Sequence, residues 1–234
     1  MIKTALQYLV DLGKVETLEI EEQQYSTAPL YHIKHPSPDA LEVQSLTALV
    51  DYVQSAFDYN FDAMMVHIVA HDRVELLSPL YSTGQRHTYM SAKAFASNFR
   101  FSQWYSLETF NIGLQACFVR TDDVVSILRV IGNIKDATIR QFGDDGVTQQ
   151  VTAKTGIASV EDVPVPNPVG LAPYRTFLEV EQPASKFVFR MRQGSQGPEC
   201  ALFEADGGAW QLEAMARVKA YLSDKLGTDL PVIG

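Results

Sequence analysis

The chain has 234 residues, of which 46% are hydrophobic and 20% are charged, and its formal net charge is −9. This composition excludes a disordered or fibrous protein, and the length allows one domain whose core needs no disulfides. The acidic balance disfavours a protein that grips nucleic-acid phosphates, and no apolar run reaches the roughly 20 residues that cross a bilayer. We therefore expect a cytoplasmic protein that does not act at a membrane and for which nucleic acid is a less favoured partner.

The first third of the chain predicts two helices and three strands. Apolar residues at helical spacing begin at Ile2 and stop at Gly13, and a strand follows over residues 15–20. A second helix runs from Leu46 to Phe57, with Ser45 as its N-cap. Residues 62–80 predict two strands joined at His71 and Asp72. Residues 81–105 show no clear period, and we assign them no structure.

The middle of the chain predicts a strand, a helix and a hairpin. Apolar and polar residues alternate over Thr109–Val119, which favours a half-buried strand. Residues 121–132 follow as a helix that begins near Thr121 or Asp122. Residues 137–153 are typical of a hairpin whose turn contains Asp145 and Gly146. The proline-rich residues 160–173 then predict a connection or rim outside any sheet.

The C-terminal third predicts a three-stranded meander followed by a long helix. The expected strands cover residues 174–181, 186–192 and 198–204, and the helix ends at Gly227. In the register that buries one face throughout, Phe203 lies beside Phe187, Ala201 beside Phe189, and Glu204 beside Lys186.

Together these elements predict an α+β fold, in which a mostly antiparallel sheet is packed by three or four helices. No linker or repeat divides the sequence. We expect one domain over residues 1–234, whose halves 1–105 and 106–234 share one core. The two cysteines, Cys117 and Cys200, fit no metal spacing and are expected as free thiols in strands.

The stretch ALFEADGGAW, residues 201–210, contains two acids that could form an acidic site. Glu204 has a structural role in the meander, opposite Lys186, and Asp206 stands where the N-cap of the last helix is expected. A metal or acid–base pair would need a third carboxylate, a histidine or a lysine, which this stretch does not supply. We therefore favour structural roles and keep an acidic site as the alternative, with no metal or cofactor predicted.

Three arginines of the meander predict an anion-binding site. Arg190 and Arg192 point to the same side of one strand, and the expected register places Arg175 opposite Arg192. Like charges that face each other across strands cost stability, and guanidinium groups bind phosphate and carboxylate well. An internal network of ion pairs is the simpler explanation of this cluster, and the anion site is the ligand site to test first.

Two further patterns indicate weaker candidate sites. In NFRFSQWY, Arg100 and Trp104 combine a cation with aromatic rings, as in single-strand-binding proteins, but a core segment with one exposed arginine is the favoured explanation. His67 and His71 lie four residues apart on an expected strand, about 13 Å from each other, which is too far for one metal ion.

The segments ETFNIGLQACF, PYRTFLEVEQPASKFVFRMR and ALFEADGGAWQLEAM resemble, in element order and turns, the C-terminal half of a bacteriophage and prophage family of unknown function, the YfdQ-like type. The resemblance covers about 120 residues and carries no catalytic residue to this chain. It implies a phage-encoded accessory protein in the host cytoplasm, encoded near replication, recombination or counter-defence genes.

These observations favour a non-catalytic protein that binds a protein partner or a small anionic, nucleotide-like ligand and that self-associates. One alternative is a metal-dependent nuclease or phosphohydrolase that uses Glu204 and Asp206 with Glu179 or Asp144. The other is a single-strand-binding accessory protein that uses Arg100 and its aromatic neighbours.

Overall fold

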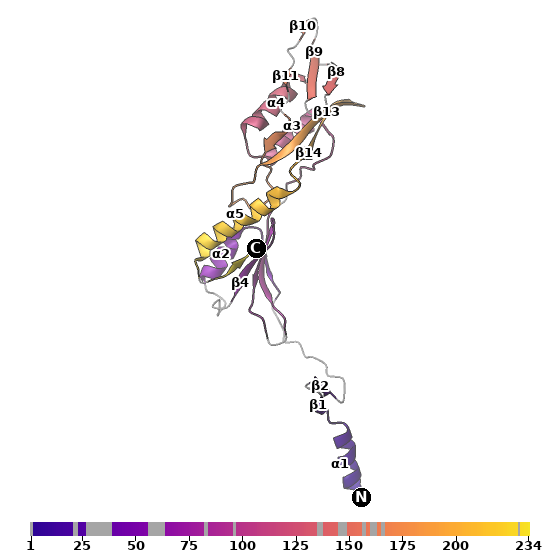
Figure 1. The fold of residues 1–234 in the computed structure, drawn as a ribbon, viewed down its shortest axis with the longest axis vertical. Coiled ribbons are helices and arrows are strands. Elements are labelled where there is room, and N and C mark those ends of the chain that lie inside the picture. The colour runs from indigo at the N-terminus through magenta and orange to yellow at the C-terminus, as the bar shows by residue number, and fades with distance from the viewer. Residues whose placement is uncertain are drawn as a thin grey trace. The chain divides into compact units, whose positions relative to one another are not determined.

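The computed structural model describes residues 2–20, 23–26, 39–55, 64–81, 84–95, 97–134, 138–144, 149–155, 158–159, 163–164, 167–228 and 230–234. The chain divides into two compact units, Met1–Pro38 and Asp39–Gly234. The first unit is drawn in indigo in Figure 1. The expectation that residues 1–234 form one domain stays a prediction.

The first unit contains a helix and a β-hairpin. Helix α1 spans Ile2–Leu12 and ends at Gly13, whose N–H donates to the carbonyl of Val10. Strands β1 (Thr17–Ile20) and β2 (Gln23–Ser26) pair antiparallel. The predicted helix and the strand after it are confirmed.

The second unit contains a five-stranded mixed sheet in the order β15-β4-β5-β6-β3. These strands are β3 (Leu41–Val43), β4 (Met65–Ala70), β5 (Arg73–Leu77), β6 (Thr88–Lys93) and β15 (Val232–Ile233). Strands β4, β5 and β6 are antiparallel to one another, whereas β3 and β15 are parallel to their neighbours. The two strands predicted around His71 and Asp72 are β4 and β5.

Helices α2 (Leu46–Ser55) and α5 (Ala209–Leu226) lie against each other beside this sheet (Figure 1). The Ser45 hydroxyl accepts from the N–H of Ala48, which confirms the predicted N-cap of α2. Alternate residues of the strands and one stripe of each helix are buried in a shared core, which includes Leu46, Leu49, Val66, Ile68, Val74, Leu76, Val218 and Leu222. The apolar faces of the strands, which repeat every two residues, and those of the helices, which repeat every 3.6 residues, therefore pack into one hydrophobic cluster.

A four-stranded antiparallel sheet, in the order β12-β13-β14-β7, forms a second core. Its strands are β7 (Tyr105–Ser106), β12 (Val169–Leu171), β13 (Ser185–Gly194) and β14 (Gly197–Glu204). Helices α3 (Leu107–Cys117) and α4 (Asp122–Ile134) cover one face of it. The buried side chains there include Phe110, Leu114, Ile127, Ile131, Phe187 and Phe189.

The remaining strands are β8 (Thr138–Asp144), β9 (Gln149–Thr155), β10 (Ala158–Ser159) and β11 (Val163–Pro164). Strands β8, β10 and β11 each pair antiparallel with β9. The predicted hairpin is confirmed in the pairing of β8 with β9, while its turn at Asp145 and Gly146 lies outside the described residues.

The fold is therefore α+β with mostly antiparallel sheets, as predicted. Four helices of the described residues, α2 to α5, belong to the second unit. Strands β12, β13 and β14 form a C-terminal meander, and the long helix α5 follows it and ends at Gly227.

The strand predicted over Thr109–Val119 is wrong, because these residues belong largely to helix α3. The Ser106 hydroxyl accepts from the N–H of Thr109 and caps the helix. Phe110 and Leu114, four residues apart, are fully buried, whereas Ile112 between them is 60% exposed. The apparent alternation therefore combined a buried helical stripe with one exposed isoleucine. Cys117, which was expected in a strand, is the last residue of this helix.

The first strand of the meander is also not the predicted one. Residues 174–181 form an irregular segment in which Leu178 is 67% exposed, and β12, inside the proline-rich residues 160–173, pairs with β13 instead. The predicted register of β13 and β14 is wrong by one residue, since Phe187 pairs with Glu204 and Val188 with Phe203. A two-residue turn between Gly194 and Gly197 sets this register. Cys200 and Leu202 therefore lie in the core of this sheet, Phe203 is only half-buried, and Ala201, although fully buried, is not part of that core.

The irregular segment after β12 is held by one buried glutamine. The side-chain oxygen of Gln182 accepts from the N–H groups of Arg175 and Thr176. Its amide nitrogen donates to the carbonyls of Phe177 and Val180. Gln182 thereby satisfies four backbone groups that no sheet partner satisfies, and it fixes the chain next to Arg175.

The two cysteines are free thiols, as predicted. Burial in the core raises the pKa of the Cys200 thiol. Cys200 therefore packs as a small apolar side chain, with no thiolate available for chemistry at neutral pH.

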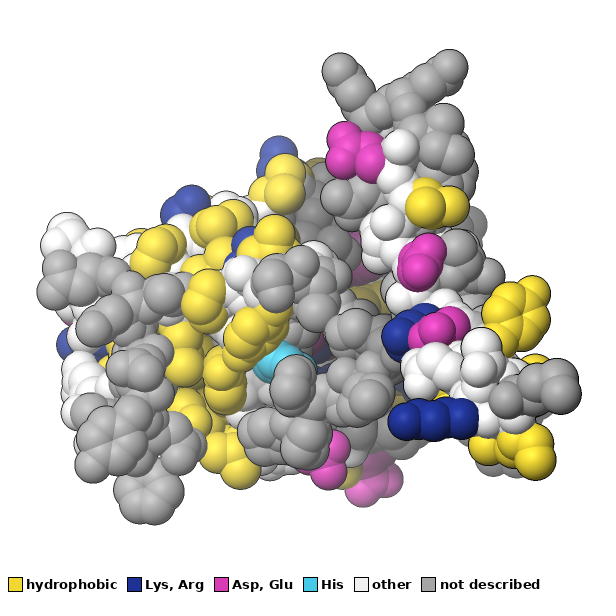
Figure 2. Space-filling model, turned by 90° about the horizontal axis from the view of Figure 1, so that it is seen from below, with side chains coloured by type: hydrophobic (Ala, Val, Ile, Leu, Met, Phe, Trp, Pro, Cys, Tyr) yellow, Lys and Arg dark blue, Asp and Glu magenta, His cyan; other side chains and the backbone are white. Residues whose placement is uncertain are grey.

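Some large hydrophobic side chains of the second unit are exposed, among them Leu41, Leu80, Tyr81 and Phe95. Figure 2 shows hydrophobic side chains gathered on one face of the molecule. Exposed apolar side chains that cluster are typical of binding surfaces.

Candidate functional site

Arg175 lies between the two cores of the second unit, against an aromatic ring. Its guanidinium carbon is 3.7 Å from the centroid of the Trp210 ring. The same carbon lies 5.8 Å from the Phe101 centroid and 5.6 Å from the Phe187 centroid. A desolvated cation over a tryptophan face is among the stronger cation–π contacts.

Two hydrogen bonds fix the orientation of the guanidinium. Nη1 of Arg175 donates to Oε1 of Glu204 at 2.7 Å, and Nη2 donates to the hydroxyl of Ser185 at 2.7 Å. The Arg175 side chain is only 7% exposed, compared with 41% for Glu204. Its Nε is buried and has no hydrogen-bond partner among the described residues. Burial lowers the pKa of Arg175 from its ordinary value, and the charges of Glu204 and Asp206 oppose that shift.

The turn before α5 places Trp210 over Arg175. Gly207 and Gly208 both have positive φ, 65° and 84°, which glycine adopts without strain. Oδ1 of Asp206 accepts from the N–H of Gly208 at 3.1 Å. The prediction that Asp206 is the N-cap of α5 is therefore wrong, because Gly208 occupies that position. The carboxylate instead closes the turn two residues earlier.

The β4–β5 turn approaches the same ring from another side. The His71 ring lies edge-on to Trp210, with centroids 4.6 Å apart. The hydroxyl of Thr176, next to Arg175, donates to the carbonyl of His71. Burial lowers the pKa of His71, Asp72 raises it and Arg175 lowers it further. The net shift is downward, so the imidazole is neutral at pH 7.

These groups surround a cavity of about 260 Å³. Half of its lining is aromatic, from Phe95, Phe99, Phe101, Tyr174 and Trp210, and the polar half is His71, Asp72, Ser97, Arg175 and Glu204. Phe95 is 63% exposed. Ligand pockets typically combine such an apolar lining with a few polar groups that fix orientation.

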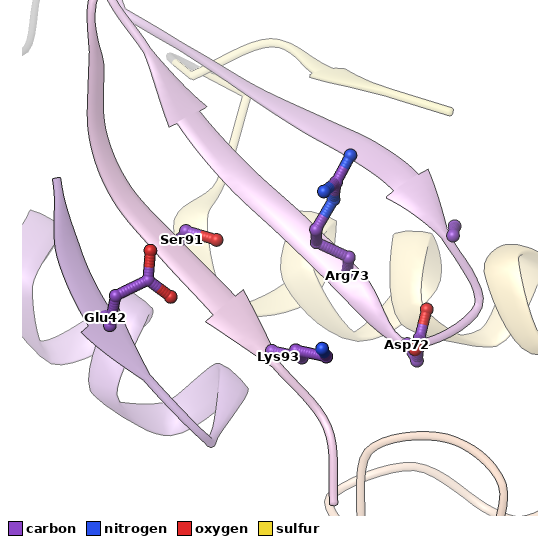
Figure 3. Close-up of a pocket in the computed structure, with 6 residues that line it drawn as sticks. Glu42, Asp72, Arg73, Ser91 and Lys93 are labelled. Atoms are coloured by element: carbon purple, nitrogen blue, oxygen red, sulfur yellow. The ribbon is translucent and has the colours of Figure 1, made fainter. Parts of the chain in front are cut away.

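A second cavity, of about 370 Å³, lies on the five-stranded sheet (Figure 3). It is lined by Ala70 and by five polar or charged residues: Glu42, Asp72, Arg73, Ser91 and Lys93. Asp72, at the β4–β5 turn, lines both cavities.

The structure separates the three arginines of the predicted anion site. Arg175 contacts Glu204 at the end of β14, whereas Arg192 pairs with Glu199 five residues earlier on that strand, at 2.8 Å. Five residues of strand span about 17 Å. Arg190 and Arg192 share one side of β13, as predicted, but Arg175 does not lie opposite Arg192.

The acids of the alternative hydrolase site have separate structural partners. Glu204 binds Arg175, and Asp206 binds the Gly208 N–H. Oε1 of Glu179 accepts from the N–H and the hydroxyl of Thr47 in the first turn of α2. Within the described part of the chain, no three His, Cys, Asp or Glu side chains are grouped to hold a metal ion.

The alternative nucleic-acid site is largely occupied by contacts within the protein. Arg100 is exposed, and its backbone N–H and carbonyl bind the Tyr105 hydroxyl. Trp104 is half-buried under Arg192, whose guanidinium carbon is 4.2 Å from a Trp104 ring centroid. Phe99, next to Arg100, is buried in the second core.

Sequence reasoning named Arg175 and Glu204 but missed their partners. Trp210, His71, Asp72 and Phe95 were not predicted as site residues, although two of them form the turn that joins β4 and β5. One signal was available: Gly207 and Gly208, separated from Trp210 only by Ala209, permit a sharp turn that can bring a ring back over the sheet.

The chain matches no protein-family model, no curated protein sequence and no solved structure. Over the described residues, no helix is both long enough and apolar enough to cross a membrane.

Replacing Arg175 by methionine should lower the free energy of unfolding by about 2–4 kcal/mol, since it removes the buried cation and leaves Glu204 without its partner. Urea denaturation measures this loss. Arg192→Met is the matched control and should cost about 1 kcal/mol or less, because the Arg192–Glu199 pair is exposed. Equal losses in the two variants would contradict the role of Arg175.

His71 should make the stability depend on pH. Its folded-state pKa is lowered, so its contribution is complete above the ordinary value of about 6.5 and is lost as the pH falls from there through the lower folded-state pKa. The urea midpoint should therefore fall between about pH 7.5 and about pH 5.5, and this fall should be smaller in His71→Gln. His67→Gln, which removes an imidazole outside the cavity, is the control. An identical fall in His71→Gln and in the wild type would refute this contribution.

Proposed function

We propose that the protein is a non-catalytic accessory protein that binds a small anionic, nucleotide-like ligand, and that the cavity beside Trp210 receives the ring of that ligand. The observation that carries this proposal is the combination of an aromatic lining with a buried guanidinium whose Nε has no partner among the described residues. A flat ring with hydrogen-bonding edges satisfies both features.

The charges that line the cavity favour the ring of the ligand, and not its phosphate, as the part that binds here. Asp72 and Glu204 add two negative charges, whereas Arg175 adds one positive charge and His71 is neutral. A phosphate here would face a net negative lining. The size of the cavity, about 260 Å³, is also slightly below the roughly 300–1,000 Å³ of typical ligand pockets, and it suits one ring system.

Binding without catalysis is supported by the hydrogen bonds that already occupy the carboxylates of Glu204 and Asp206. Glu204 and Asp206 each have a partner within the protein, so neither carboxylate is poised as a general base for a bound ligand. The resemblance of the C-terminal half to the YfdQ-like family supports a phage or prophage origin. On that basis we place the protein in the host cytoplasm, with a role in counter-defence or beside replication and recombination.

We also propose self-association of two copies through the sheet edge at β3, where Leu41 is exposed. The edge at β12 is less suited, because the N–H of Gly170 already donates to Asp123 at 2.6 Å. Sedimentation equilibrium tests this proposal, and a monomer at every concentration would exclude it.

The ligand proposal is tested by calorimetric titration with the four ribonucleosides and their 5′-monophosphates. At least one nucleotide should bind, and Phe95→Ala should weaken its binding about tenfold, since stacking of a base on an aromatic ring is worth about 1–3 kcal/mol. Leu212→Ala, which removes an exposed side chain of α5, is the control and should bind as the wild type does.

Two results would count against the proposal. Equal affinity of the Phe95→Ala variant and the wild type would remove the cavity as the ring site. Chemical conversion of the bound nucleotide by the purified protein would contradict binding without catalysis.

A further inference from the structure

The carboxylate of Asp72 borders both cavities of the second unit. Asp72 lies in the β4–β5 turn and lines the aromatic cavity together with His71, and it lines the sheet cavity together with Arg73. The end of β6 connects the cavities in the same way, because Lys93, its last residue, lines one and Phe95, two residues beyond it, lines the other. A ligand too large for either cavity can therefore extend across Asp72 from one into the other.

The sheet cavity supplies the cations that the aromatic cavity lacks. Arg73 and Lys93 are direct neighbours across β5 and β6, so both side chains leave the same face of the sheet, although their charged ends point in different directions (Figure 3). Nε of Arg73 lies 3.6 Å from Glu75, longer than a hydrogen bond. Lys93 has no carboxylate within 4.0 Å among the described residues. The positive charges of Arg73 and Lys93 are thus less neutralised by nearby carboxylates than the charge of Arg175 is.

The polar residues of the sheet cavity follow a defined order in space. Figure 3 shows Arg73 and Lys93 on neighbouring strands between Asp72 on one side and Ser91 on the other, with Glu42 beyond Ser91. Ser91 pairs with Glu42 across β6 and β3, and its side chain is nearly buried. From the aromatic cavity outward, the sequence of groups is therefore rings, a carboxylate, two cations with a hydroxyl, and a second carboxylate.

This order matches the parts of a nucleoside monophosphate. We propose that the ligand is a ribonucleoside monophosphate that spans both cavities: the base among the aromatic rings, the ribose hydroxyls on Asp72, and the phosphate on Arg73, Lys93 and Ser91. Carboxylates bind ribose hydroxyls in many nucleotide sites, and a guanidinium, an ammonium and a hydroxyl are all phosphate donors. This inference rests on the proposed function and names its ligand class.

Glu42 sets the length of the phosphate chain. Seen from Arg73 and Lys93, Glu42 lies beyond Ser91 (Figure 3), so a triphosphate would carry its terminal charges toward that carboxylate. Like charges at short range repel. The site therefore selects monophosphates over triphosphates.

Calorimetric titration of the full chain tests the inference with each nucleoside, its 5′-monophosphate and its 5′-triphosphate. The best monophosphate should bind about tenfold more tightly than its nucleoside, as expected for one charge-assisted contact, and more tightly than its triphosphate. Lys93→Gln and Arg73→Gln should each remove most of the gain from the phosphate and leave nucleoside binding unchanged. Lys186→Gln, at an exposed lysine on β13, is the matched control and should keep the gain. Glu42→Gln should restore triphosphate binding.

The outcomes separate this inference from the proposed function. If nucleosides bind in the aromatic cavity but the phosphate adds no affinity, or if Lys93→Gln and Arg73→Gln keep that affinity, the phosphate site is overturned and the ring site stands. If neither nucleosides nor nucleotides bind, both proposals fall. Circular dichroism confirms that each variant is folded, and these side chains line a surface cavity, so their loss leaves the core intact.

Discussion

The guanidinium of Arg175 against the Trp210 ring is the contact on which the second unit depends. It lies where two hydrophobic cores meet, one built on the four-stranded sheet and the other on the five-stranded sheet. Glu204 from β14, Ser185 from β13 and Trp210 from α5 all bind the same side chain. Because a buried cation is costly without such partners, each of these elements has one favoured position relative to the others. The cavity beside Trp210 is a consequence of that arrangement.

The same contact explains why the site has two parts. Arg175 cannot serve as an independent anion site, since Glu204 already neutralises it and its side chain is almost fully buried. Two exposed cations, Arg73 and Lys93, line the adjacent sheet cavity and are paired across β5 and β6. Asp72 lies at the boundary because the β4–β5 turn brings one end of these two strands next to Trp210. The ring and the phosphate of the ligand would thus be bound by different elements, which the β4–β5 turn connects.

Local signals predicted much of the fold, and the errors arose where distant contacts decide. Ser45 and the stripe beginning at Leu46 identified α2 correctly, because capping and helical spacing are local. Helix α3 was mistaken for a strand, since the exposed Ile112 completed a false alternation and only packing of Phe110 and Leu114 shows the difference. Residues 174–181 looked like a strand, yet the Gln182 side chain satisfies their backbone groups in place of a neighbouring strand.

The site was less predictable than the fold. Arg175 and Glu204 were both named, but in different candidate sites, because they are 29 residues apart and only the tertiary structure pairs them. Arg192 was grouped with Arg175 on a register that the two-residue turn at Gly194 and Gly197 rules out. Asp72 and Phe95 carry no local mark of function, since a turn aspartate and a single phenylalanine are common. Their importance follows from the cavities they line.

The most direct test of the site uses the fluorescence of Trp210. The chain contains two tryptophans, so Trp104→Phe leaves Trp210 as the sole indole reporter, in contact with both Arg175 and the cavity. Titration of this variant with the ribonucleoside monophosphates should change the emission in a saturable way for at least one of them, and Phe95→Ala in the same background should remove most of the change. Emission that stays constant while calorimetry detects binding would show that the ligand binds elsewhere, and would contradict the site.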